Sequence, residues 1–230
     1  MKLGKRLVSV AAAVALVAGA GVMAATPASA KMTRTVSGGS VITVPLATIT
    51  GAAGAGVTIS AIKPALAEAT SDGVGVAFPA QIPKTDGVLP HRGGLSLASA
   101  KTSVTLTWRN PAIEYATSGG DTAVISGIVN GIPDSNPLAP MLNGKPLALF
   151  DVKNFTTGWK IGKVKKVGKK YQKVLTQTMS GDVYVTSSET IVGGLNALMG
   201  VALFTAGTQF GTLNTEWSVT VRCDTAKECK

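Results

Sequence analysis

Residues 94–129 read GLSLASAKTSVTLTWRNPAIEYATSGGDTAVISGIV, and this stretch decides the class of fold. Apolar and β-branched residues alternate with polar ones in short runs, and Gly, Pro, Asn or Asp lies between most of the runs. A period of two places alternate side chains on one face of an extended strand. The pattern therefore predicts four strands, at 94–99, 103–108, 112–117 and 122–129.

Runs of the same kind continue on both sides of this stretch. Further strands are predicted at 40–50, 56–62, 147–155, 173–179, 182–187 and 215–222. Short strands at this spacing, with turn residues between them, are typical of antiparallel sandwiches and barrels. We therefore predict a mainly β fold, an antiparallel sandwich or barrel-like domain, that covers residues 31–230 as a single unit.

One short helix is predicted near the C-terminus. Ser187 or Ser188 can cap its first turn, where Glu189 also favours the positive end of the helix dipole. Apolar residues then follow at helical spacing up to Met199, and Gly200 is a natural end. The uncharged stretch that contains this helix, residues 190–211, is interrupted by glycines, so we interpret it as buried core rather than a membrane span.

The first thirty residues have the pattern of an export signal. A basic start, MKLGKR, precedes an apolar run, and the small residues Ala28-Ser29-Ala30 form a cleavage site. We predict a signal peptide over residues 1–30, and a mature protein that is secreted, extracellular or associated with the cell envelope. A retained membrane anchor is the alternative, since the apolar run is nearly long enough to span a bilayer.

Two cysteines, Cys223 and Cys229, lie close together at the C-terminus. Outside the cytoplasm such a pair most simply forms a disulfide, which would fix a tail that otherwise frays. A redox or metal-binding role is the alternative. With a single His in the chain and no third Cys, no metal site is expected.

The positive charge is concentrated in one segment. The chain of 230 residues has a formal charge of +10. Three of these charges lie in residues 1–30 and seven in WKIGKVKKVGKKYQK, residues 159–173, so the remainder is formally neutral. We predict a hairpin there, with Gly168 in its turn. Its candidate residues for binding an anionic polymer are Trp159, Lys160, Lys163, Lys165, Lys166, Lys169, Lys170, Tyr171 and Lys173.

The expected partners of this hairpin are acidic cell-wall polymers or lipid headgroups. Nucleic acid is not expected, because the segment has no Arg to form bidentate contacts with phosphates or bases. The alternative is a solvated hairpin whose Lys residues only discourage pairing with other strand edges.

The sequence offers little for catalysis. His91 is the single His, the acidic residues are scattered singly, and neither a G-x-S-x-G nucleophile motif nor a glycine-rich phosphate loop occurs. No catalytic residue and no enzymatic activity are therefore expected. Beside His91 lies Arg92, which can pair with a carboxylate, so these two residues are the candidates for binding a small anionic ligand. A turn histidine hydrogen-bonded to the backbone is the alternative for His91.

Residues 91–115, HRGGLSLASAKTSVTLTWRNPAIEY, resemble the haem-transport-associated (HtaA-type) domain of secreted actinobacterial proteins. Those domains carry a G-H-x-G-x-L-type turn, a strand and then an N-P-x-I/V step. A later segment, LFTAGTQFG at 203–211, is similar to a degraded form of the F-Y-x-A-G-T segment of that family. The residues that match the first motif are His91, Gly93, Gly94, Leu95, Asn110, Pro111 and Ile113.

The resemblance implies a β-rich, non-enzymatic binding module and, as its cofactor, haem. In that family a Tyr in an early S-F-x-x-Y motif ligates the iron, and the turn His lies within hydrogen-bonding reach of it. Here His91 matches, but no Tyr occurs before Tyr115. The predicted function is that of a secreted binding or surface-associated domain, a divergent haem-transport-type module. The alternative is a cell-envelope protein that binds acidic polymers through the Lys-rich hairpin.

Overall fold

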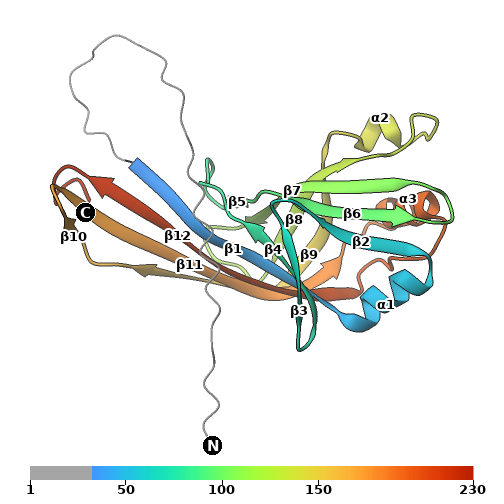
Figure 1. Ribbon diagram of the computed structural model, residues 1–230, viewed down its shortest axis with the longest axis horizontal. Helices are drawn as coiled ribbons and strands as arrows, with labels where there is room; N and C mark the ends of the chain where they lie inside the picture. The colour runs from blue at the N-terminus through green and yellow to red at the C-terminus, as the bar shows by residue number, and fades with distance from the viewer. Residues whose placement is uncertain (1–32, 230) are drawn as a thin grey trace, which may run out of the picture.

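The computed structural model describes residues 33–229, so the predicted signal peptide lies outside the described residues. Antiparallel strands make up most of this part of the chain (Figure 1). The strands are β1 (Thr33–Pro45), β2 (Val57–Ile62), β3 (Leu66–Thr70), β4 (Gly73–Pro79), β5 (Val88–Pro90), β6 (Gly94–Ser99), β7 (Thr105–Tyr115), β8 (Ala123–Asn130), β9 (Pro146–Ile161), β10 (Lys165–Val167), β11 (Lys170–Val185) and β12 (Gln209–Cys223). The helices are α1 (Leu46–Gly54), α2 (Ala139–Leu142) and α3 (Glu189–Met199).

All the strands belong to one sheet that curls into a nearly closed barrel, which confirms the predicted fold class. The strand order is β2-β6-β7-β8-β9-β11-β12-β1-β4-β3, with β5 paired to β7 and β10 to β11. The alternation that predicted the strands is visible in β8, where every second side chain is buried from Ala123 to Val129. Strand β6 has the predicted bounds, 94–99.

Four strands extend beyond the barrel and form a separate arm (Figure 1). Strand β9 pairs with β8 only as far as Val152, and β1 pairs with β4 only from Gly39 onward. Beyond these points β9, β11, β12 and β1 pair only with one another and with β10. We call residues 33–38, 153–178 and 216–229 the arm, and the other described residues the body.

The core of the body is organised around Trp108, of which 2% is exposed. Its ring meets Phe78 and Phe150 edge to face, at centroid distances of 6.3 and 5.6 Å, and Phe150 in turn stacks against Phe210 at 4.8 Å. On the neighbouring strand, Gly127 leaves room for the indole, because a Cβ there would lie 2.2 Å from Trp108 Nε1. These contacts between distant strands hold the barrel together through dispersion and apolar burial.

Three expectations about the strands need correction. The predicted strands 103–108 and 112–117 form one strand, β7, which bulges at Asn110, where φ is +51°. Likewise, 173–179 and 182–187 lie in one strand, β11. A turn residue inside a long strand produced a local bulge rather than an end, because strands on both sides continue the hydrogen-bonded ladder.

Residues 40–50 do not form a strand throughout, because β1 ends at Pro45 and α1 begins at Leu46. Pro45 has no N–H to donate to the sheet, and several alanines follow it within α1. The short helix α2 was also not predicted. The predicted C-terminal helix is confirmed as α3, with Ser188 accepting a hydrogen bond from Ile191 N and Gly200 left-handed at φ +66°.

Two local predictions for the arm are confirmed. Gly168 lies in the turn between β10 and β11, with φ +62°, and Cys223 and Cys229 form a disulfide. Within residues 33–229, the structure contains no helix long and apolar enough to cross a membrane.

Candidate functional site

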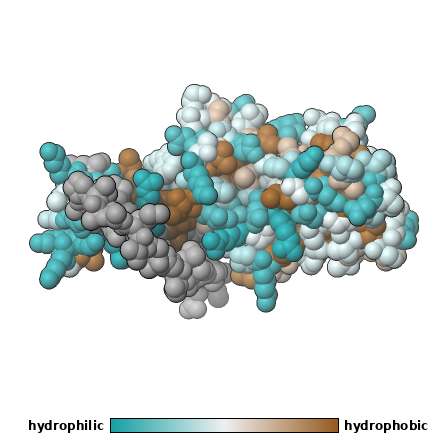
Figure 2. Space-filling model, turned by 90° about the horizontal axis from the view of Figure 1, so that it is seen from above, coloured by the Kyte–Doolittle hydropathy of each residue, from teal (hydrophilic) through white to brown (hydrophobic). Residues whose placement is uncertain are grey.

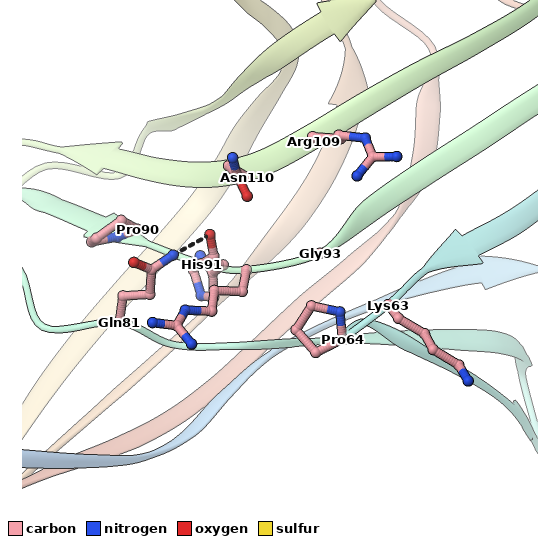
Figure 3. A pocket seen from close by; sticks show the side chains of 9 residues that line it. Lys63, Pro64, Gln81, Pro90, His91, Gly93, Arg109 and Asn110 are labelled. Carbon is pink, nitrogen blue, oxygen red and sulfur yellow. Dashed lines mark hydrogen bonds between the residues drawn. The ribbon is translucent and has the colours of Figure 1, made fainter. Parts of the chain in front are cut away.

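A pocket with a volume of about 460 Å³ opens at the turn that contains His91. The turn follows β5, and β7 supplies the other wall near its bulge. In Figure 3, Gln81 and Pro90 lie at one end of the pocket, while Lys63 and Arg109 lie toward the other, beyond Gly93. The lining residues are Lys63, Pro64, Gln81, Pro90, His91, Arg92, Gly93, Arg109 and Asn110.

His91 forms the floor of this pocket and is almost completely buried, with 1% of its surface exposed. Its Nδ1 faces the carbonyl oxygen of Pro111 at 3.2 Å, and its Nε2 lies 2.7 Å from Ser40 Oγ on β1. Gln81 Nε2 donates to the His91 carbonyl oxygen at 2.9 Å and ties the turn to the preceding loop. The histidine therefore links three parts of the body, and both of its ring nitrogens have partners.

These contacts determine the tautomer of His91. A carbonyl oxygen can only accept, so Nδ1 carries the hydrogen that is donated to Pro111. In the neutral ring Nε2 must then accept from the Ser40 hydroxyl. Ser40 Oγ is also 2.7 Å from Thr215 Oγ1, and because its own hydrogen is used, Thr215 is the donor. A directed chain of hydrogen bonds thus runs from Thr215 through Ser40 and His91 to Pro111.

Burial lowers the pKa of His91 from 6.5 to about 4, against the opposing effect of hydrogen bonds to the Pro111 and Leu89 backbone. The cationic form would lose its hydration and gain no carboxylate partner. His91 is therefore neutral at physiological pH. It contributes a fixed hydrogen-bond network to the pocket rather than a charge.

Positive charge at the pocket comes from three side chains, Lys63, Arg92 and Arg109. All three are exposed, and no acid lines the pocket within residues 33–229. Gly93, at φ +90°, keeps the turn close to the chain after β2, because a Cβ at this position would lie 2.5 Å from the Ala65 nitrogen. Such a rim of cations around a neutral floor suits a ligand with carboxylate or phosphate groups.

The side chains present do not fit the haem ligation that the sequence resemblance implies. The residue that meets His91 Nε2 is Ser40, an alcohol that lacks the phenolate oxygen of a Tyr ligand. Both ring nitrogens of His91 are already hydrogen-bonded, and no Phe, Trp or Tyr is among the described residues that line the pocket. The Tyr of β7, Tyr115, instead accepts a hydrogen bond from Gln177 of the arm. The side chains of this pocket therefore do not fit iron ligation of that kind.

The second candidate site lies on the arm, well away from the pocket in the fold (Figure 1). Six of its seven Lys residues are exposed, while Lys173 and Tyr171 are half-buried. Lys170 Nζ forms an ion pair with Asp224 at 3.2 Å, and both side chains are about half exposed, so the pair adds little stability. The structure thus places the two groups of sequence-predicted residues, the His91 turn and the Lys-rich hairpin, in different parts of the molecule.

Sequence reasoning missed several residues that the fold brings to the pocket. Arg109 directly precedes Asn110 and Pro111 of the family-like motif, so its position in the sequence could have indicated that it lies near the His91 turn. Lys63 and Gln81 belong to no motif. Ser40 and Thr215 are 175 positions apart and meet only because β1 and β12 are neighbours in the sheet.

Comparison with known proteins finds no matching family model and no matching curated protein. Among solved structures, the haem-binding protein HtaB from Corynebacterium glutamicum is similar, with 11% identity over 84% of this chain and 99% of that chain, and a TM-score of 0.48. The C-terminal domain of HtaA from the same organism is also similar, with 12% identity over 80% of this chain and 99% of that one, and a TM-score of 0.43.

Proposed function

We propose that this protein is an exported, non-enzymatic binding module whose pocket at His91 holds a small ligand bearing carboxylate or phosphate groups. One observation carries the proposal: Lys63, Arg92 and Arg109 line a pocket to which the described part of the chain contributes no acidic residue. Cations that meet an anionic ligand in a concave site form stronger contacts than the same groups on a flat surface. The amides of Gln81 and Asn110 add neutral hydrogen-bond donors to the lining.

The sequence resemblance makes a porphyrin with two propionates the first ligand to test. Because the pocket supplies cations but no iron ligand, recognition rests on the carboxylates and not on the metal. We therefore expect haemin and metal-free protoporphyrin IX to bind with similar affinity. Titration of the full chain, followed by fluorescence quenching of the protein, measures both dissociation constants.

The variant Arg92→Gln/Arg109→Gln tests this assignment. Binding of both porphyrins should weaken at least about tenfold, since each charge-assisted contact contributes roughly 1.5–3 kcal/mol. The matched control is Arg34→Gln/Arg222→Gln, which removes the same charge from exposed positions on the arm. Equal effects of the two double variants, or binding of haemin alone, would show that the pocket does not recognise the carboxylates.

A second function is favoured by the concentration of exposed Lys on the arm. We propose that the arm docks on anionic components of the cell envelope. Retention on an anionic matrix should fade as salt rises, because exposed charges are screened beyond about 8 Å at physiological ionic strength. Replacement of Lys163, Lys165, Lys166, Lys169 and Lys170 by Gln should abolish the retention. Retention that is insensitive to both changes would exclude this function.

A further inference from the structure

The end of the arm exposes large apolar side chains among its Lys residues. Trp159 is 55% exposed, Ile161 66% and Val167 54%. Six exposed Lys residues lie within the same hairpin. Figure 2 shows hydrophilic residues gathered at this end of the molecule, with hydrophobic patches beside them. Apolar residues and cations are thus presented together on one protruding element.

The position of β9 explains why Trp159 and Ile161 are exposed. Trp159 and Ile161 point to the same face of β9, opposite Gln177 and Leu175 of β11. In the body this face is covered by other strands, and Phe155, at the base of the arm, is still buried. Beyond it β9 is an edge strand, because its pairing with β8 ends at Val152. Ile161 therefore lies at the border of the sheet, and only one side of Trp159 is packed, against Trp217 at 5.9 Å.

The positive charge of residues 159–173 indicates that the partner of the arm is anionic. Residues 159–173 contain seven Lys and no acid. One acid that approaches them, Asp224, is paired with Lys170. The remaining exposed Lys residues, such as Lys163 and Lys166, can turn their flexible stems toward an anionic surface while apolar neighbours enter it.

We propose that the end of the arm binds the surface of an anionic lipid bilayer, with Trp159, Ile161 and Val167 entering the headgroup region. This inference rests on the second proposed function and identifies its partner. Indole rings favour the interface between water and hydrocarbon, since they have an apolar body and a polar N–H. A hydrated acidic polymer would pair with the Lys residues but would leave Ile161 and Val167 in water, so lipid fits both features of the surface.

The depth of insertion is limited by the backbone. The free edge of β9 presents N–H and C=O groups that need water or another partner. Such groups do not enter the hydrocarbon region without a large cost. The arm therefore lies within the headgroup layer, and only side chains reach the apolar boundary.

The fluorescence of Trp159 provides a direct test. The other two Trp residues, Trp108 and Trp217, are 2% and 3% exposed, and none lies in residues 1–32. The full chain is mixed with vesicles of phosphatidylcholine alone, or with 30 mol% phosphatidylglycerol added. We expect a blue shift of the emission, and quenching by lipids brominated near the headgroup, only with the anionic vesicles. A Trp159→Phe variant should lose both signals.

Two variant sets separate the contributions of charge and apolar contact. Replacing Lys163, Lys165, Lys166 and Lys169 by Gln should weaken the vesicle-induced signal at least about tenfold in apparent affinity. The control replaces Lys84, Lys101 and Lys145, three exposed Lys residues of the body. Ile161→Thr should weaken binding about threefold, whereas Met141→Thr, at a 64% exposed residue of α2, should have no effect.

Polyphosphate distinguishes this inference from the function on which it rests. If the chain binds polyphosphate but shows no change in Trp159 emission with anionic vesicles, the lipid inference is wrong while the anionic docking function stands. If the chain binds neither polyphosphate nor anionic vesicles, both the lipid inference and the anionic docking function are wrong. An unchanged signal in the hairpin Lys variant, or an equal loss in its control set, also overturns the lipid inference.

Discussion

The body and the arm belong to the same sheet but are stabilised in different ways. In the body, Trp108 is enclosed by rings and by strands that are paired on both sides. At the inner face of the arm, a polar residue, Gln177, is fully buried, and the exposed Trp159 packs on one side only. The arm also buries large apolar side chains, Phe155 and Trp217, but there the buried Gln177 orders its neighbours through hydrogen bonds. The arm is also the part that leaves apolar groups and charge available to a partner.

Gln177 is the centre of the hydrogen bonds at the base of the arm. Its Oε1 accepts from Trp217 Nε1 at 2.9 Å, and its Nε2 donates to Tyr115 Oη and to Thr157 Oγ1, each at 3.0 Å. Tyr115 belongs to β7 of the body, so this network joins the two regions. Substitutions in each region separately therefore test whether the body and the arm are stabilised in different ways.

The largest effect is expected from Trp108→Ala in the body. The substitution removes the largest fully buried side chain and leaves a cavity between Phe78 and Phe150. It should lower the free energy of unfolding by about 4 kcal/mol. Urea denaturation measures this change. A loss below about 1 kcal/mol would show that the ring contacts do not organise the core.

The next largest effect is the loss of folding stability at acidic pH, which originates at His91 in the body. The unfolded pKa of His91 is 6.5 and the folded value about 4, so between these values the unfolded state binds more protons. Stability should therefore be fully present above pH 6.5 and fall by about 1.4 kcal/mol per pH unit below it, for a total of about 3 kcal/mol by pH 4. Unfolding at several pH values measures the slope.

The variant His91→Gln isolates this contribution, because His91 is the chain's single histidine. It should be less stable than the natural chain at pH 7 but should lack the histidine component of the slope. Parallel pH profiles for the two proteins would mean that His91 does not titrate differently in the folded and unfolded states.

At the base of the arm, Gln177→Leu should lower the free energy of unfolding by about 2 kcal/mol. The side chain has a similar size, but the Trp217 and Tyr115 polar groups lose their buried partner. Gln172→Leu, at a half-buried position of the same strand, is the control and should change stability little. Chemical denaturation of both variants provides the comparison. An equal response would indicate that apolar packing holds the arm as it does the body.

The smallest effect is expected from Trp159→Ala near the end of the arm. It removes the edge-to-face contact with Trp217, which contributes about 1 kcal/mol or less at an exposed position. The loss of unfolding free energy expected for Trp108→Ala is about four times as large, and this ratio measures how differently the body and the arm are packed. If Trp159→Ala destabilises as strongly as Trp108→Ala, the arm is part of the core and its Trp is not available to a partner.

The sequence by itself determined the local features of this protein. Alternation over 94–129 gave the strand class, Ser188 and Gly200 marked the ends of α3, and Gly168 marked a turn. The two cysteines and the concentration of Lys at 159–173 were also evident. Each of these signals depends on residues that are close together in the chain, and so on backbone preferences that act within one turn or strand.

Only the tertiary structure decided how these pieces meet. It brought Lys63 and Arg109 to the His91 turn, and it placed Ser40 and Thr215 in one hydrogen-bond chain. It also separated an enclosed Trp108 from an exposed Trp159, although both lie in predicted strands or hairpins. The physical reason is that burial and pairing depend on which strands become neighbours when the sheet closes, and a local pattern does not contain that order.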